Sequence, residues 1–184
     1  KDEYAREMRS LREEMKTREG IERLRKKAED VWLSVPHKFM HGFQNVNVSG
    51  DYVYESKNAR DSFQARGLED VRFCQFIKDE RVKDAYDYTI WGDNAELIYE
   101  CCNVGAGVYN VRFSYVCALG HTMNLEYCFW CIESTDLFGC SAIRKKKYCI
   151  LNKQYSESDF HALRSRIVED MNTNPYIDDR GRIW

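Results

Sequence analysis

Three segments in the middle of the chain share one order of residues. Each begins with Asn and continues with four apolar residues at alternate positions, the last of which is Cys; the segments run Asn94 to Cys101, Asn110 to Cys117 and Asn124 to Cys131. Alternation of this kind places one complete face of a strand in a core. The same order found three times is an internal repeat. It predicts a core ladder of stacked residues made of Ala95, Leu97, Tyr99, Cys101, Val111, Phe113, Tyr115, Cys117, Leu125, Tyr127, Phe129 and Cys131.

Asn or Asp also precedes weaker copies of this pattern on both sides. Together with the Asn residues of the three clear copies, these residues occupy positions 58, 70, 84, 94, 110, 124 and 136. Two such steps make about 26 residues, a length typical of one solenoid coil. Asn and Asp suit corners, because their side chains satisfy local backbone groups and tolerate positive φ.

The fold class expected from these features is a right-handed parallel β-solenoid over residues 45–155. The alternative is an antiparallel meander or sandwich, whose strands recur at a similar spacing. Two-residue hairpins favour Asn-Gly or Asp-Gly, and the chain contains neither. Repetition of one residue type at equivalent positions also suits stacking, which favours the solenoid.

Helices are expected at both ends of the repeats. Residues 1–34 carry two apolar stripes at helical spacing and read as a charged amphipathic helix or helix pair, with a break or kink predicted at Gly20. This region is either a coiled-coil arm for a partner or a helix packed on its own domain. Residues 156–172 are expected to form a capping helix that begins with Ser156, followed by an irregular tail over 173–184.

The eight cysteines favour buried free thiols over disulfides. Their density is about half of that typical of disulfide scaffolds, and they fall at strand positions. Cys128 and Cys131 form a C-x-x-C pair, but residues three apart on a strand of period two point to opposite faces. We therefore expect a reducing, cytoplasmic environment, no metal and no cofactor.

Charge gives little guidance to a partner. Lys and Arg number 28 and Asp and Glu 30, which gives no global case for nucleic acid. The one compact basic run is Arg144, Lys145, Lys146 and Lys147, a candidate contact for an anionic protein or nucleic-acid partner. No apolar run is long enough to span a bilayer, so no membrane partner is expected.

The phrases Asp136 to Cys140 and Lys147 to Ser156, together with Val35 to His37 and Asn47 to Asp51, carry a family resemblance. With them the chain resembles a group of uncharacterised Tyr/Cys-rich repeat proteins of uncultivated candidate-phyla bacteria. The resemblance implies a repeat domain placed between zinc-ribbon-like segments. Those ribbons are absent here, so the resemblance implies no zinc ligand in this sequence and no activity.

The function expected from the sequence is a non-enzymatic binding or scaffolding module that presents a rigid solenoid face to a protein or nucleic acid. One alternative is a carbohydrate-active enzyme with outer-face carboxylates, for which Asp84 with Asp87, or Asp51 with Asp61, are candidates. Another is a purely structural spacer. An enzyme requires converging carboxylates in a cleft, whereas a scaffold requires an exposed aromatic or basic stripe along the coils.

Overall fold

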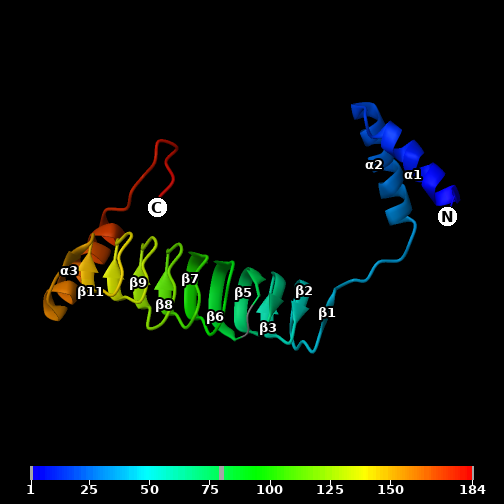
Figure 1. Ribbon diagram of the computed structural model, residues 1–184. Helices are drawn as coiled ribbons and strands as arrows, with labels where there is room; N and C mark the ends of the chain where they lie inside the picture. The colour runs from blue at the N-terminus through cyan, green and yellow to red at the C-terminus, as the bar shows by residue number, and fades with distance from the viewer. Residues whose placement is uncertain (1, 79–80, 184) are drawn as a thin grey trace. The chain divides into compact units, whose positions relative to one another are not determined.

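The computed structural model describes residues 2–78 and 81–183, which fall into two units. The first unit ends at Phe39 and contains helices α1 (Asp2–Glu14) and α2 (Arg18–Leu33). The second begins at Met40 and is a β-solenoid of about nine turns over its described residues, followed by helix α3 (Glu157–Thr173), as Figure 1 shows. None of the described helices is long and apolar enough to cross a bilayer.

Helices α1 and α2 form a hairpin. Thr17 caps α2, and its hydroxyl oxygen accepts a hydrogen bond from the backbone N–H of Gly20 at 3.0 Å. A Cβ at Gly20 would lie 1.8 Å from the backbone oxygen of Glu14, the last residue of α1. The break therefore falls at residues 15–17, before Gly20, and the glycine allows the two helices to approach closely. Ile21 and Trp32 of this hairpin remain exposed.

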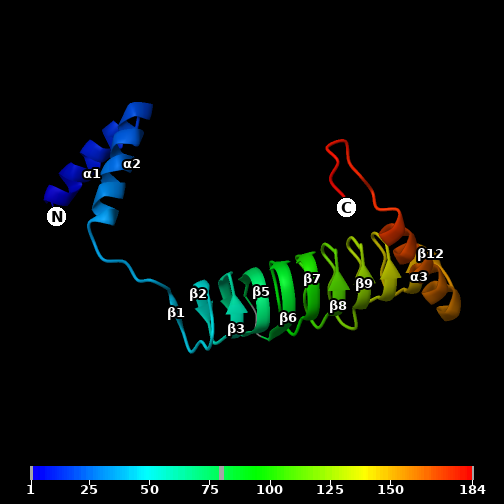
Figure 2. The same ribbon diagram turned by 180° about the vertical axis from the view of Figure 1, so that it is seen from behind.

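Successive coils of the solenoid pair in parallel, and the predicted β-solenoid is confirmed. The last strand, β12, differs by pairing antiparallel with β11. The strands are β1 (Gly42–Phe43), β2 (Gly50–Tyr54), β3 (Lys57–Arg60), β4 (Ser62–Arg66), β5 (Leu68–Ile77), β6 (Val82–Thr89), β7 (Glu96–Cys102), β8 (Tyr109–Arg112), β9 (Met123–Glu126), β10 (Thr135–Phe138), β11 (Lys147–Ile150) and β12 (Lys153–Gln154). Seen from either side, in Figures 1 and 2, they stack in one row that ends at α3.

Every third residue of a coil points inward. In β5, Leu68, Val71 and Cys74 are buried, and the pairs of residues between them lie at the surface or partly so. The residue before a buried one turns the chain with a left-handed backbone, as at Asp70 (φ 53°) and Phe73 (φ 56°). The predicted alternation with period two is therefore wrong. The period is three, with a corner in each step.

One coil takes 11 to 14 residues, and not the 26 predicted. Gly50 pairs with Ser62, which lies 12 residues further on, and Tyr109 pairs with Met123, 14 residues on. Apart from the two steps that meet at Asn94, a step between successive Asn or Asp residues of the series is thus one whole coil. With three residues to a side, a coil of this length has four corners.

The predicted place of Asn and Asp at corners is confirmed, and they form a ladder along one edge of the solenoid. Asn58, Asp70, Asn110, Asn124 and Asp136 all have φ between 52° and 56°. The amide of Asn58 donates to a carboxylate oxygen of Asp70 at 2.7 Å. In the same way Asn110 donates to Asn124, and Asn124 to Asp136, each at 2.9 Å. Each of these asparagines thus binds the next coil.

One member of the predicted series, Asn94, lies outside this Asx ladder. Glu96 pairs with Tyr109, so Leu97 is the residue that stacks on Asn110. Leu97 has no amide to donate. The side-chain oxygen of Asn110 is consequently buried without a hydrogen-bond partner among the described residues.

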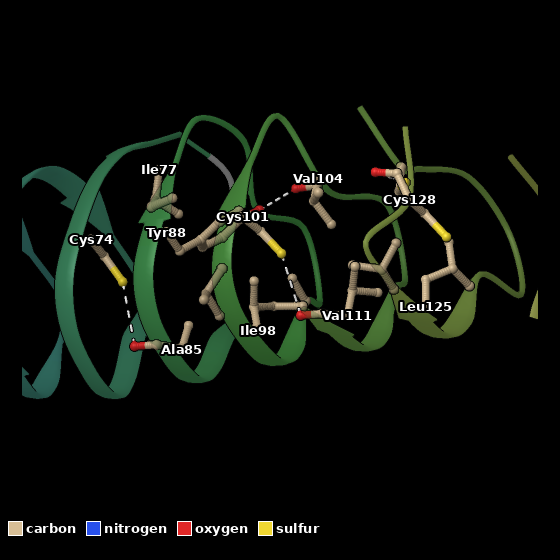
Figure 3. Packing of buried hydrophobic residues seen from close by; sticks show 14 of the residues in the cluster. Cys74, Ile77, Ala85, Tyr88, Ile98, Cys101, Val104, Val111, Leu125 and Cys128 are labelled. Carbon is tan, nitrogen blue, oxygen red and sulfur yellow. Dashed lines mark hydrogen bonds between the residues drawn. The ribbon is translucent and has the colours of Figure 1, made fainter. Parts of the chain in front are cut away.

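A second column of equivalent positions runs through the core and consists of short polar or sulfur side chains and one Tyr. It is made of Ser62, Cys74, Tyr88, Cys101, Ser114, Cys128 and Cys140. Figure 3 shows the thiols of Cys74 and Cys101 reaching the backbone oxygens of the next coil, and the Tyr88 hydroxyl bound to the Val104 oxygen. This cysteine column is buried throughout.

Serine and cysteine play one role in this column. The Ser114 hydroxyl donates to the backbone oxygen of Arg112 at 2.7 Å, and the Cys101 thiol donates to that of Tyr99 at 3.2 Å. The Ser114 oxygen also accepts the backbone N–H of Cys128 in the next coil at 3.1 Å. Each side chain therefore satisfies backbone groups at a corner, where the strand ladder is interrupted.

Helix α3 packs on the last coils. Phe160 is buried against Phe138 and Ile150, in a cluster separate from the solenoid core. Arg164 reaches Glu126 with two nitrogens, at 2.7 and 2.8 Å from its carboxylate oxygens. The helix thus covers an outer side of the solenoid by apolar burial and one forked ion pair.

Candidate functional site

Six residues of the predicted core ladder lie on the surface. Their exposed fractions lie between 36% and 48%; they are Leu97, Tyr99, Phe113, Tyr115, Tyr127 and Phe129. The other six are buried; they are Ala95, Cys101, Val111, Cys117, Leu125 and Cys131. Periods of two and three agree at every sixth residue, so only the two ends of each predicted segment point inward. The prediction is wrong for the middle of each segment, and five of its misplaced members are aromatic.

Two rows of side chains run along the solenoid axis in this region. The first, the corner row, is Asp87, Glu100, Phe113 and Tyr127. The second, the strand row, is Thr89, Cys102, Tyr115 and Phe129. Members of the two rows in one coil are two residues apart, and the residue between them points into the core. The repeat therefore builds both rows from one local pattern.

A shallow groove of about 700 Å³ lies between these rows and crosses four coils. Both rows line it, and Cys101, Ser114 and Cys128 of the cysteine column lie at its floor. Cys102 also lines it and is the one partly exposed thiol among the eight, the others being buried. The groove is apolar at one end and acidic at the other.

The rings in the apolar part are stacked on one another along the axis. The ring centres of Phe113 and Tyr127 are 4.8 Å apart with 12° between the planes, and those of Tyr115 and Phe129 are 5.8 Å apart with 8° between planes. Tyr99 covers Phe113 edge-on from the preceding coil. The faces of these rings therefore largely contact other rings, and the groove is lined by ring edges.

The acidic end carries Asp87 and Glu100 in adjacent coils. Two arginines lie nearby and pair with other carboxylates. Arg72 binds Asp61 at 3.3 Å, and Arg112 lies 3.8 Å from Glu126. Glu100 raises the pKa of the neighbouring Tyr99 hydroxyl by its charge and by a hydrogen bond. This end of the groove is thus a local centre of negative charge.

The predicted basic run lies elsewhere, at a corner of the last coils. Arg144 is 2.8 Å and Lys145 3.8 Å from the same carboxylate oxygen of Glu133. The ammonium of Lys147 lies 4.4 Å from the ring centre of Tyr148. Lys146 is exposed, and its backbone N–H binds Ser134. The run therefore wraps a corner, and one carboxylate offsets two of its four cations.

The other candidate carboxylates do not meet in one site. Asp84 belongs to the column of the Asx ladder, and Asp61 binds Arg72 and Ser49. Asp51 accepts hydrogen bonds from His41, chiefly from its backbone N–H, which lowers the pKa of the carboxyl. Of the four, only Asp87 lines the groove.

The geometry expected for the C-x-x-C pair is wrong as well. Cys128 and Cys131 both point into the core, because the period is three. The thiols of Cys128 and Cys131 donate to the backbone oxygens of Glu126 at 3.3 Å and of Cys140 at 3.4 Å. Over the described residues, no group of three or more His, Cys, Asp or Glu side chains is arranged to hold a metal ion.

Comparison with known proteins adds no identity to this geometry. No family model, no curated protein and no solved structure matches the chain. The resemblance to Tyr/Cys-rich repeat proteins stays a prediction.

Proposed function

We infer that this chain is a non-enzymatic binding module whose solenoid presents the aromatic groove to an extended segment of a partner protein. The observation that carries this conclusion is the pair of exposed rows across four coils. Rings this large are normally buried, and a continuous exposed array of them is typical of an interaction surface. The parallel coils hold the rows in fixed register, so little order is lost on binding.

A protein partner agrees better with the groove than a nucleic acid does. Nucleic-acid grooves combine cations that track phosphates with ring faces on which bases stack. This groove instead has Asp87 and Glu100 at one end, and its rings are stacked on one another. The basic run, which would favour an anionic partner, lies at another corner and is partly offset by Glu133.

The test of this function is selection of linear peptides from a displayed 12-residue random library on the immobilised full chain. We expect enriched peptides to protect Cys102 from a fluorescent alkylating reagent, because this thiol lines the groove. The Phe129→Ser variant should lose both enrichment and protection. Its matched control is Phe63→Ser, which removes a ring of the same 47% exposure in a coil outside the groove.

Two outcomes would overturn the proposal. One is equal enrichment on the wild-type chain and on Phe129→Ser, which would place the binding surface elsewhere. The other is that no enriched peptide slows the alkylation of Cys102. Circular dichroism of both variants establishes that a loss of binding does not come from unfolding, because both rings are on the surface.

A further inference from the structure

We propose that the ligand of this groove is a proline-rich peptide in the polyproline II conformation, with an arginine or lysine bound at the Asp87 and Glu100 end. This inference rests on the proposed function and names the class of partner. Four features of the groove lead to it: its repeat along the axis, the spacing of its rows, the lining of its walls and its charge.

The repeat of the groove matches the polyproline II helix. Successive coils of a parallel solenoid are separated by about 4.8 Å, so two coils span about 9.6 Å. Polyproline II has three residues per turn and rises about 3.1 Å per residue, which makes about 9.3 Å per turn. Side chains three residues apart would therefore meet equivalent positions on every second coil. An extended β-strand repeats every two residues, about 6.8 Å, and matches neither one coil nor two.

The spacing of the two rows favours a slender occupant over an α-helix. The two rows are contributed by residues two apart on one coil, such as Phe113 and Tyr115. Residues so placed on an extended chain are separated by about 7 Å. An α-helix with its side chains measures about 10–12 Å across, so it would contact the tops of the rows and would not enter the groove. A polyproline II helix is slender, and its prolyl rings pack well between aromatic walls.

The lining of the walls favours prolyl and aliphatic groups over sugars. A sugar or a base binds by stacking on a ring face, but the faces of Phe113 and Tyr127 are turned toward one another. Ring edges still offer apolar contact to the CH₂ groups of proline. The four coils span three spacings, about 14 Å, which is enough for about five residues of polyproline II.

Charge complementarity fixes one end of the ligand. Asp87 and Glu100 lie in adjacent coils at the end of the apolar section, and the nearby Arg72 and Arg112 pair with other carboxylates. A guanidinium or ammonium group there would meet two carboxylates. A basic residue next to a proline-rich stretch is therefore the occupant that this end selects.

The experiment is fluorescence anisotropy of the full chain with four synthetic seven-residue probes. Two are proline-rich with arginine at the amino or the carboxyl end, the third replaces arginine by glutamate, and the fourth replaces the prolines by glycine. We expect an arginine-proline probe to bind at least tenfold more tightly than the glutamate and glycine probes. The double variant Asp87→Asn with Glu100→Gln should lose this arginine preference, because amides keep the shape and remove the charge.

The outcomes separate this inference from the proposed function. If display-selected peptides protect Cys102 but the glycine probe binds as well as the proline probes, the polyproline II ligand is wrong and the peptide groove stands. If the double variant keeps the arginine preference, the assigned end is wrong. If an unlabelled glucan oligosaccharide or a homothymidine oligonucleotide displaces the probe from the groove, both the ligand class and the protein partner are wrong.

Discussion

At the scale of single residues, the solenoid depends on side chains that satisfy backbone groups at corners. A left-handed backbone costs a non-glycine residue roughly 1–2 kcal/mol, and this chain adopts it in every coil. The inward residue after such a corner is often Ser or Cys, whose hydroxyl or thiol donates to a backbone oxygen two residues earlier. The unusual cysteine content thus serves the same need as serine, with a larger and less polar atom in the core.

Ser114 tests this role. The Ser114→Ala variant should leave the buried backbone N–H of Cys128 without its acceptor and lower the free energy of unfolding by about 2 kcal/mol. The Ser114→Cys variant should lose less than about 1 kcal/mol, because cysteine occupies equivalent positions in the same column. Urea unfolding followed by circular dichroism measures both. Equal losses in the two variants would show that a thiol cannot replace the serine hydroxyl at this corner.

Leu97 offers a gain of stability at the gap in the Asx ladder. The Leu97→Asn variant should raise the free energy of unfolding by about 1 kcal/mol, since asparagine can donate to the orphaned oxygen of Asn110 and prefers the left-handed φ of 57°. Leu97→Asp is the matched control, because it has the same shape and no donor when ionised. If thermal unfolding shows the aspartate variant to be as stable as the asparagine one, the ladder bond is not the cause.

At the scale of elements, local signals in the sequence predict the C-terminal helix, but alternation predicts the wrong strand period. The helix expected over residues 156–172 corresponds to α3, since an N-cap at Ser156 and helical apolar spacing are both local features. The strands of the later coils are only four residues long, too short to separate periods of two and three. The better signal was a small or apolar residue at every third position, as in Leu125, Cys128 and Cys131.

The same error hid the groove. Alternation with period two places Phe113, Tyr115, Tyr127 and Phe129 on an inward face, whereas the period of three leaves them exposed. The sequence offers Asp87 as one of several candidate carboxylates and gives no sign of its neighbour Glu100. The proximity of Asp87 and Glu100 depends on the register between coils, which pairs Tyr88 with Cys101. The order of residues along the chain does not by itself give that register.

At the scale of the whole molecule, register is fixed by several columns at once. On one outer side Lys57, Glu69, Lys83 and Glu96 follow one another in adjacent coils. Charges of opposite sign at paired positions stabilise neighbouring strands, and charges of like sign destabilise them. A slip that placed like charges together would also shift the Asx ladder and the cysteine column. The correct stacking of coils is thus specified by outer charges and inner hydrogen bonds together.

The buried thiols predict how stability depends on pH. Burial raises the pKa of Cys74 and Cys101 to about 12, whereas the pKa of a thiol in an unfolded chain is about 8.5. Above about pH 9 the unfolded chain therefore binds fewer protons than the folded one, and stability falls as the pH rises toward 12. Across that window each thiol should contribute a loss of about 1.4 kcal/mol per pH unit.

The measurement is urea unfolding under reducing conditions from about pH 8 to about pH 10, since two such thiols predict a steep decline over that interval. The Cys74→Ser, Cys101→Ser double variant is the control, because serine does not titrate and already occupies equivalent positions at Ser62 and Ser114. Tyr88 and the other titrating groups are common to both chains, so the difference between them isolates the two thiols. We expect the variant to lose stability less steeply with rising pH. Parallel declines would mean that these thiols ionise without cost in the folded chain, and that the column is open to solvent.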